Sequence, residues 1–346
     1  MVGIGVMLCG LFNGQEACKS RLKSIPGGYG MKDVSKKDWG EADIPSQSGK
    51  VILVTGANIG LGYEASRMLA AKSAHVLMAC RSRGRAEAAR SKIKEISPFA
   101  RVDIVDLDLA DLESVAQVPA QLAELGVSQI DVLINNAGIM RPPRRNLTKQ
   151  GFESQFGTNH LGHFALTRTL MPLLAPTARI VNVSSLADRY SDVNWDDLQW
   201  EVKYSPSTAY GQSKTANLLF TKMLNERLTE CGSQIMALAA HPGISDTNLV
   251  EASDLKKFAW LIRGMSRLGI GPYPKIQTPA MGALPQVYAA TGDVEPGAYY
   301  GPANRGYGHP SRAEQYRAPH SESPDSAKRL WALSEELTGA KFDLAG

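Results

Sequence analysis

The sequence predicts one α/β domain built on a doubly wound parallel sheet with helices on both faces. From Val51 onward, short runs rich in β-branched residues alternate with longer Ala- and Leu-rich segments of helical spacing. The first run leads directly into a glycine-rich turn, and no repeat or low-complexity tract interrupts the alternation. Strands that alternate with helices favour parallel pairing, because parallel neighbours need a crossover connection.

The strand candidates are short hydrophobic runs bounded by polar or glycine-containing segments. In chain order they are residues 51–55, 75–80, 101–107, 129–135, 178–184 and 234–240, with a late strand at 298–301. A last helix is expected to begin with Ser323 as its N-cap and Pro324 in its first turn, and to end at Gly339. One Rossmann-like domain over residues 41–346 accounts for all of these elements.

Residues 1–40 precede this pattern and are expected to form a flexible tail. Residues 2–12 are apolar, but no basic region precedes them and glycines interrupt them, unlike a signal peptide. No apolar run in the chain approaches the ~20 residues that span a bilayer. A weak membrane anchor in this tail is the alternative interpretation.

Composition excludes several classes of function. The formal net charge of +4 is small and dispersed, which argues against nucleic acid as a partner. The four cysteines, at positions 9, 18, 80 and 231, show neither disulfide nor metal-ligand spacing. Free thiols in a reducing compartment are therefore expected, which favours a cytoplasmic location, and no metal site is predicted.

A glycine-rich turn joins the first strand to the first helix, and such a turn presents bare backbone N–H groups and a helix dipole to a pyrophosphate. A merely tight turn is the alternative. The spacing TGxxxGxG resembles the short-chain dehydrogenase/reductase family, and this resemblance implies a nucleotide-binding turn. The expected contacts in it are Gly56, Asn58, Ile59, Gly60, Leu61 and Gly62.

The segment after the second strand predicts the choice of cofactor. NAD-dependent enzymes of this fold usually carry a carboxylate here, which repels a 2′-phosphate. This chain has Arg81 at that position and no carboxylate until Glu87. A guanidinium can fork onto a phosphate, so Arg81 indicates NADP(H) as the cofactor. A solvated basic loop is the alternative, and it explains Arg83 and Arg85 well.

The resemblance continues along the chain and implies further cofactor contacts. One pair after the third strand resembles the pair that holds adenine, and the NNAG segment ends the fourth strand. A Pro-Gly pair after the sixth strand, with a following threonine, resembles the element that grips the nicotinamide carboxamide and opens a lid at about 243–279. These residues are Asp108, Leu109, Asn135, Ala137, Gly138, Pro242, Gly243 and Thr247.

A YxxxK motif supplies the candidate general acid. Ser205 and Pro206 start a helix, so Tyr210 and Lys214 lie one turn apart on one face. A tyrosine has a reference pKa of ~10, and a neighbouring ammonium lowers it. The same motif also arises in amphipathic helices whose lysine merely reaches solvent.

The rest of the catalytic set comes from the resemblance. Ser185, the second serine after the fifth strand, is implied to hydrogen-bond the substrate oxygen, with Ser184 as the nearest rival. Asn159 is implied to complete the tetrad by holding a water in the proton relay. His160 and His163 beside it lack a third ligand at sensible spacing, so packing roles are expected rather than metal binding.

Several motifs, NHLGHF and VNVSS among them, look like the retinol dehydrogenase-like branch of the family. Ser185 and Tyr210 lie 25 positions apart (210 − 185), which indicates a loop insertion. That branch also lengthens this loop. The loop neighbours a helix that many relatives use for dimerisation, so both monomer and homodimer remain open.

Together these features predict an oxidoreductase that transfers hydride between NADP(H) and a lipophilic carbonyl or alcohol, retinoid-like or xenobiotic. Residues 253–268 predict an amphipathic helix over the substrate mouth, whose basic face suits peripheral contact with a membrane. An ordinary surface helix packed on the sheet is the alternative. A catalytically silent NADP(H)-binding sensor or scaffold is the alternative, although such a protein has no need of Tyr210. Epimerases and dehydratases of the extended branch have a different glycine spacing.

Overall fold

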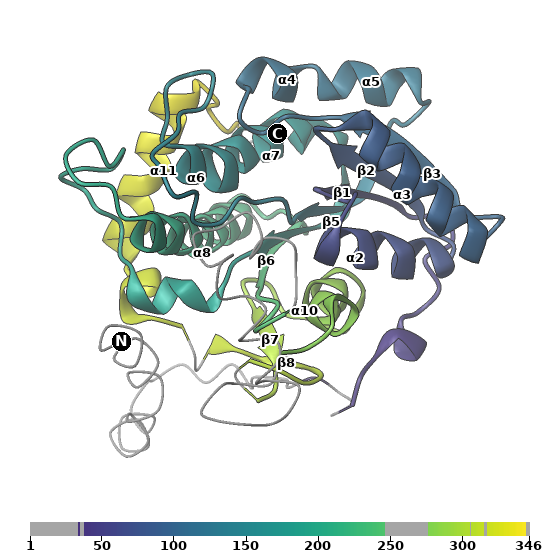
Figure 1. The fold of residues 1–346 in the computed structure, drawn as a ribbon. Coiled ribbons are helices and arrows are strands. Elements are labelled where there is room, and N and C mark those ends of the chain that lie inside the picture. Colours follow the sequence, from purple (N-terminus) through teal and green to yellow (C-terminus); the bar gives the residue numbers. More distant parts are fainter. Residues whose placement is uncertain (1–33, 35–37, 246–275, 305, 315–316, 344–346) are drawn as a thin grey trace. The chain divides into compact units, whose positions relative to one another are not determined.

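An eight-stranded sheet lies at the centre of the part of the chain that the computed structural model describes, which comprises residues 34, 38–245, 276–304, 306–314 and 317–343. The strand order is β3-β2-β1-β4-β5-β6-β7-β8, and Figure 1 shows the twist of this sheet. All neighbours pair in parallel except β7 and β8. The predicted doubly wound parallel sheet is thereby confirmed.

The strands follow the hydrophobic runs of the sequence closely. Their bounds are β1 (Val51–Thr55), β2 (His75–Cys80), β3 (Arg101–Asp106), β4 (Ile130–Asn135), β5 (Leu174–Val183), β6 (Met236–Ala240), β7 (Tyr299–Pro302) and β8 (Pro310–Arg312). Strand β5 begins at Leu174 rather than at residue 178. Strand β8 was not predicted, because its three residues Pro-Ser-Arg carry no strand pattern and depend on antiparallel pairing with β7.

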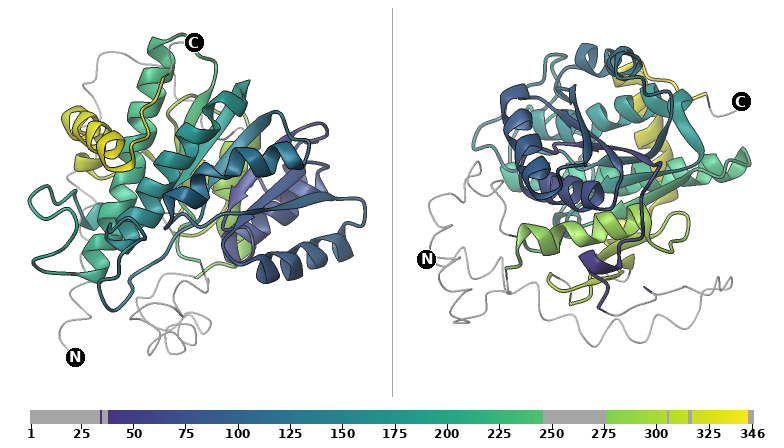
Figure 2. Two further views of the ribbon diagram at one scale, coloured as in Figure 1. Left: turned by 90° about the horizontal axis from the view of Figure 1, so that it is seen from above. Right: turned by 90° about the vertical axis from the view of Figure 1, so that its right-hand side faces the viewer.

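Helices cover both faces of the sheet (Figures 1 and 2). One face carries α2 (Gly60–Ala71), α3 (Arg83–Ile96) and α10 (Pro279–Thr291). The other carries α4 (Leu112–Ala116), α5 (Val118–Glu124), α6 (Ser154–Phe156), α7 (Gly162–Leu170), α8 (Pro206–Glu230) and α11 (Pro324–Thr338). Short turns of helix occur at η1 (Glu41–Asp43), η2 (Gly157–Leu161), η3 (Met171–Leu173), η4 (Leu186–Tyr190) and η6 (Pro319–Glu322).

Each buried strand contributes side chains to two separate cores. Ile52 and Val54 of β1 belong to the core under α2, α3 and α10, whereas Leu53 belongs to the opposite core. This alternation follows from the two-residue period of a strand. Because both faces are covered, the central strands β1, β2 and β4 to β6 consist mostly of hydrophobic residues, as is typical of parallel strands.

The last helix behaves as its sequence predicts. The Ser323 hydroxyl accepts a hydrogen bond from the Ser326 N–H (3.2 Å) at the start of α11, and Gly339 ends the helix at φ 65°. Trp331 on its inner face packs against Phe164 of α7 and Phe220 of α8, with ring centroids 5.2 and 5.9 Å apart. Helix α11 therefore closes the outer side of α7 and α8.

Packing begins before residue 41, where the sequence places the start of the domain. Trp39 is 5% exposed and lies edge-on to Tyr288 with ring centroids 5.1 Å apart. Its carbonyl accepts a hydrogen bond from His309 Nδ1 (2.9 Å), and Val34 is also buried. Trp39, which the sequence analysis assigns to the tail, is thus a core residue.

Three further expectations lie wholly or mostly outside the described residues. The amphipathic helix at 253–268, most of the lid at 243–279, and Thr247 all fall there. Among the helices that the structure does describe, none has the length and apolar character needed to cross a membrane.

Candidate active site

The predicted site residues gather at the carboxyl edge of the sheet. Strands β1, β4, β5 and β6 end there next to one another, so the turns that follow them meet at one edge. In an open α/β sheet this edge is where ligands bind. The catalytic candidates come from the end of β5, from η2 and from α8, all on the same side of the molecule.

The glycine turn has the geometry that a dinucleotide needs. Gly56 and Gly60 adopt φ angles of 67° and 57°, which strongly favour glycine. A Cβ at Gly56 would lie 3.0 Å from the Cα of Ala137, so the turn packs directly on the NNAG segment. Helix α2 then starts at Gly60, and its N-cap residue Ile59 makes no side-chain hydrogen bond, so the first N–H groups of the helix are available to an anion. The residues present therefore fit a pyrophosphate.

Asparagines of the NNAG segment brace the strands rather than reach outward. The Asn135 amide donates to Asn182 Oδ1 (2.8 Å) and to Thr167 Oγ1 (3.0 Å), which ties β4 to β5 and α7. The Asn136 amide donates to the Thr55 carbonyl (2.8 Å), and its nitrogen would lie 2.6 Å from a Cβ at Gly62. These contacts hold the glycine turn against β4.

Asp108 and Leu109, the pair after β3, both make contacts within the protein. An Asp108 carboxylate oxygen accepts a hydrogen bond from the Ala110 N–H (3.0 Å), and the Leu109 side chain is buried in the core. Contact between this pair and an adenine ring remains a prediction. For Leu109 such a contact would involve the main chain, because its side chain packs inward.

Two arginines after β2, Arg81 and Arg83, look alike in the sequence but differ in their contacts. Arg83 forms an ion pair with Asp106 (2.7 Å) and a longer one with Glu87 (3.4 Å). Arg81 is exposed, and no hydrogen bond or ion pair to it is found within the described part of the chain. The guanidinium at the end of β2 is thus available to an incoming anion.

Tyr210 and Ser185 form the centre of the catalytic candidates. Burial raises the pKa of the Tyr210 phenol above its usual value, and a hydrogen bond with Ser185 acts in the opposite direction. Ser184 donates instead to the main-chain carbonyl of Lys214 (3.0 Å) and is fully buried. Of the two neighbouring serines, Ser185 is therefore the one that faces the tyrosine.

Lys214 lies one helical turn beyond Tyr210 and is buried. Its ammonium donates to the carbonyl of Val183 (3.0 Å) at the end of β5, and it lies 5.7 Å from the centroid of the tyrosine ring. Burial lowers the pKa of Lys214 from 10.5 to about 8. A cation held at this place favours the ionised form of the phenol.

Asn159 lies in η2, a turn of π-helix that the sequence does not predict. Its side chain is fully buried and both polar atoms have protein partners. Oδ1 accepts from the Ile139 N–H (2.8 Å), while Nδ2 donates to the Ile139 carbonyl (3.0 Å) and to Ser213 Oγ (2.9 Å). The implied role of Asn159 in holding a water stays a prediction.

The Pro242-Gly243 turn is fixed by its neighbours. Gly243 has a φ of 64°, and its N–H donates to His241 Nδ1 (3.1 Å). The Pro242 carbonyl accepts hydrogen bonds from Ser245 Oγ (2.9 Å) and from the Gln277 amide. Because the turn follows the end of β6, it lies at the same edge as the other candidates. Its predicted partner Thr247 lies outside the described residues.

Two residues outside the predicted site help to hold this edge together. Sequence reasoning did not single out Thr55 and expected no contact with the site from His163. The Thr55 hydroxyl contacts the N–H groups of Asn136 and Ala137 (both 2.9 Å) and His163 Nε2 (2.9 Å). Thr55 is the first letter of the TGxxxGxG motif, which was its available signal. His163 had none beyond its neighbourhood to Asn159, although its burial agrees with the expected packing role.

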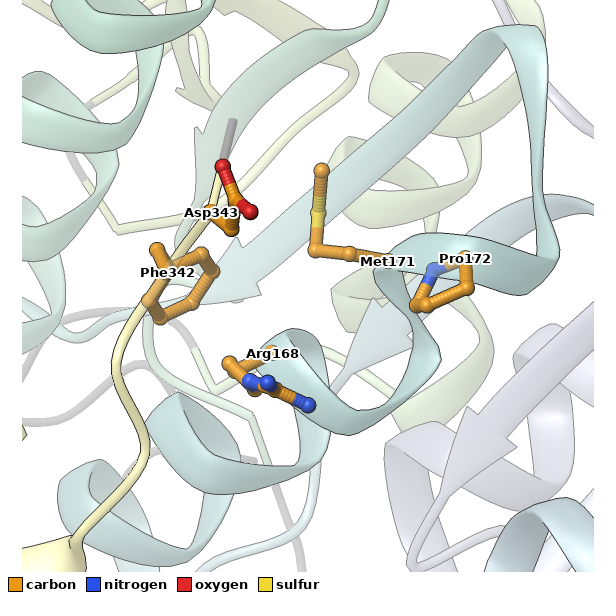
Figure 3. A pocket seen from close by; sticks show the side chains of 5 residues that line it. All are labelled: Arg168, Met171, Pro172, Phe342 and Asp343. Atoms are coloured by element: carbon orange, nitrogen blue, oxygen red, sulfur yellow. The ribbon is translucent and has the colours of Figure 1, made fainter. Parts of the chain in front are cut away.

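A cavity of about 290 Å³ lies away from this edge (Figure 3). Its lining residues are Arg168, Met171, Pro172, Phe342 and Asp343. It is situated where α7 leads into the amino end of β5, whereas the candidate site occupies the carboxyl ends of the strands. This cavity is therefore separate from the candidate active site.

Comparison with known proteins identifies the family. A family model described as short chain dehydrogenase matches residues 50–257. Retinol dehydrogenase 13 of Homo sapiens is 38% identical over 308 residues, which cover 86% of this chain and 86% of that protein.

Solved structures agree with this assignment. The crystal structure of an uncharacterized protein from Mycobacterium paratuberculosis is 42% identical with a TM-score of 0.72, and covers 88% of this chain and 99% of that one. A short chain dehydrogenase from Burkholderia cenocepacia in complex with NADP is 25% identical with a TM-score of 0.56, over 74% of this chain and 96% of that one. The present chain therefore belongs to the short-chain dehydrogenase/reductase family, in its retinol dehydrogenase-like branch, and is an oxidoreductase of alcohol and carbonyl groups.

Proposed function

We propose that this protein reduces a lipophilic aldehyde or ketone with NADPH, or oxidises the corresponding alcohol with NADP⁺. The observation that carries the proposal is the contact of Ser185 with Tyr210, beside buried Lys214, at the sheet edge that also holds the glycine turn. A phenol, a hydroxyl and an ammonium are the groups that carbonyl reduction needs around the substrate oxygen.

Each residue of the site has a separate role in this reaction. When bound, the cofactor would supply hydride to the carbonyl carbon. Ser185 donates a hydrogen bond to the carbonyl oxygen, and Tyr210 transfers its phenol proton to that oxygen as negative charge develops. Lys214 stabilises the phenolate that remains. Asn159 holds the main chain of Ile139 through two hydrogen bonds and so keeps the wall of the site in place.

Preference for NADP(H) is supported by the loop after β2. Arg81 is exposed and has no partner among the described residues, and a guanidinium binds phosphate with two parallel hydrogen bonds. The related Burkholderia enzyme was solved with NADP. A carboxylate would repel the 2′-phosphate at this place, and none occurs before Glu87.

A lipophilic substrate is supported by two arguments. The relative at 38% identity is a retinol dehydrogenase, so its name points to a carbon-rich alcohol. The sequence of residues 253–268 predicts an amphipathic helix, with apolar side chains on one face and basic side chains on the other. We infer that this segment covers the substrate and that its basic face suits peripheral contact with an anionic membrane surface.

The test is a series of straight-chain aldehydes of increasing length, assayed by loss of NADPH absorbance. A buried methylene contributes ~0.8 kcal/mol, so kcat/KM should rise several-fold per added CH₂ until the pocket is full. A retinoid aldehyde should lie at the top of the series. A flat series, or a preference for charged sugars, would contradict a lipophilic substrate.

The same assay separates the enzyme from a catalytically silent NADP(H)-binding protein. Binding of NADPH without turnover of any member of a broad carbonyl panel would support the sensor or scaffold. Turnover that disappears in Tyr210→Phe, while NADPH still binds, would support the enzyme.

A further inference from the structure

His163 is a buried histidine that connects two parts of the candidate site. It lies in α7, four residues after Asn159, and is 1% exposed. Its Nδ1 lies 2.9 Å from the main-chain carbonyl of Asn159, and its Nε2 lies 2.9 Å from the Thr55 hydroxyl. One imidazole thus spans the π-turn of the tetrad asparagine and the residue that precedes the glycine turn.

The surroundings of Thr55 determine which nitrogen of His163 is protonated. The Thr55 hydroxyl oxygen accepts hydrogen bonds from the N–H groups of Asn136 and Ala137, both at 2.9 Å. These bonds use its two lone pairs, so the oxygen has only its proton left to offer. His163 Nε2 at 2.9 Å is a nearer acceptor than the Ile134 carbonyl at 3.4 Å. Nε2 is therefore unprotonated.

The contact of the other ring nitrogen, Nδ1, independently indicates the same Nδ1–H tautomer. The carbonyl oxygen of Asn159 can only accept a hydrogen bond, so Nδ1 must carry a proton to form the 2.9 Å contact. Burial also lowers the pKa of His163 to about 4, which keeps the ring neutral at physiological pH. The ring therefore donates a hydrogen bond from Nδ1 to the Asn159 carbonyl and accepts one at Nε2 from the Thr55 hydroxyl.

We propose that His163, as the neutral Nδ1–H tautomer, is a positioning residue that couples the cofactor-binding turn to the main chain of Asn159. The inference rests on the proposed function, because it assigns His163 to the same reaction. Thr55 also holds the N–H groups of Asn136 and Ala137, so a shift of this strand end moves the ring and with it the π-turn. Loss of the ring's two hydrogen bonds should therefore impair the chemical step and cofactor binding by separable routes.

His160 provides a matched control. It lies in the π-turn, three residues before His163, and is equally buried, and its Nε2 lies 2.9 Å from Ser334 Oγ of α11. Its ring packs among the aromatic side chains of Phe156 and Phe220, away from the glycine turn. Replacement of His160 should therefore disturb packing without disturbing the connection to Thr55.

Three substitutions of His163 separate its two hydrogen bonds. His163→Phe keeps a ring and removes both bonds. His163→Asn places an amide N–H near the position of Nδ1, within reach of the Asn159 carbonyl but not of Thr55. His163→Gln extends an amide to the position of Nε2, within reach of Thr55 but not of Asn159.

The readouts are kcat, KM for the aldehyde, the dissociation constant of NADPH and the thermal midpoint, all measured on the full chain. We expect His163→Phe to lower kcat about tenfold, the scale of two lost hydrogen bonds, with the aldehyde KM within about twofold of the parent value. His163→Asn should recover most of kcat, and His163→Gln most of the NADPH affinity. His160→Phe should lower the thermal midpoint and leave kcat within about twofold.

Two results would overturn the proposal. One is a loss of kcat in His160→Phe as large as in His163→Phe, which would mean that both rings only fill the core. The other is equal behaviour of His163→Asn and His163→Gln, which would mean that the two bonds are not separate.

A measurement on the unmodified protein needs no turnover. The chain has six histidines, and ¹⁵N-labelled imidazole signals distinguish the two neutral tautomers. The signal that disappears in His163→Gln should report a protonated Nδ1 throughout pH 6 to 8, and a protonated Nε2 would refute the proposal. If the parent protein turned over no carbonyl compound, the proposed function would fail, while this spectrum and the NADPH affinities would still decide the role of His163.

Discussion

The catalytic cluster of Asn159, Ser185, Tyr210 and Lys214 differs from the loop after β2 in how its side chains are held. Asn159 and Lys214 are buried, and each has protein partners for its polar atoms. Arg81 is exposed at the end of β2 and, within the described residues, has no partner. Both regions lie at the carboxyl edge of the same sheet, so their difference does not come from their place in the fold.

The difference shows which tasks need rigidity. Proton transfer depends on distances that must be correct before the substrate arrives, so the protein orders these side chains during folding. Discrimination between two cofactors needs only a charge that can meet a phosphate, and a mobile guanidinium suffices for that. Substitutions in the cluster should therefore affect rate, and substitutions in the loop should affect cofactor choice.

The largest effect is expected from Tyr210→Phe. This change keeps the ring and removes the proton donor, so kcat should fall ~10²-fold or more, the usual scale for a lost general acid. The dissociation constant of NADPH and the thermal midpoint should stay close to the parent values. Retention of most of the activity would show that another group donates the proton.

Arg81→Asp tests the loop alone. The parent should prefer NADPH to NADH by at least tenfold in kcat/KM, because a hydrogen bond to a charged group contributes about 1.5–3 kcal/mol. The variant should invert this preference without lowering kcat for its preferred cofactor. Arg85→Asp makes the same charge change nearby, in the first turn of α3, and it should alter the ratio far less. Equal use of both cofactors by the parent would contradict the assignment.

The buried lysine predicts a pH dependence of the rate. Lys214 has a pKa of about 8, so its ammonium form predominates below that pH. Reduction that needs this cation should be independent of pH up to about 8 and should then fall toward a tenfold loss per pH unit. Lys214→Arg keeps the positive charge at high pH, and the decline should move upward in that variant. A rate that rises steadily above pH 8 would contradict the role of the ammonium.

The same group has the opposite effect on stability. Between pH 8 and the ordinary lysine pKa of 10.5, the folded protein has lost this proton and the unfolded chain still holds it. Stability rises with pH wherever the unfolded state binds more protons, so Lys214 should add to the free energy of unfolding in this range. Denaturant titrations of the parent and of Lys214→Met at pH 7.5 and 9.5 would measure this contribution.

The smallest effect is expected from shortening the chain at its start. Removal of residues 1–30 should leave kinetics and thermal midpoint unchanged, because their sequence shows no core-facing pattern. Trp39→Ala should instead destabilise the fold by about 3–5 kcal/mol, the usual cost of truncating a buried tryptophan. A loss of soluble folded protein on removing residues 1–30 would show that this segment belongs to the domain.

Much of the fold follows from local pattern, since the core strands coincide with runs that are hydrophobic on both faces. Strand β8 escapes prediction because Pro310–Arg312 pairs only with β7 and shows no pattern of its own. The π-turn at Gly157–Leu161 escapes as well, because it inserts one residue into an otherwise ordinary helical sequence.

In the candidate site, too, some residues could be predicted from motifs and others could not. Motif spacing singles out Ser185, Tyr210 and Lys214 as a set, because their chemistry depends on residue type. Motif spacing does not reveal that Thr55 and His163, 108 positions apart, share a hydrogen bond. Such a contact depends on how β1 and α7 pack together, which is a tertiary property.

Helix α11 has a consequence for proteolysis. The aromatic face of Phe164 and Phe220 is covered by Trp331 and Phe342. All four tetrad residues precede this helix in the sequence, so a cut shortly before Pro324 would remove none of them. Such a cut would instead expose the aromatic face, and exposed apolar surface promotes aggregation and further proteolysis. Helix α11 therefore protects a protein whose catalytic groups all lie outside it.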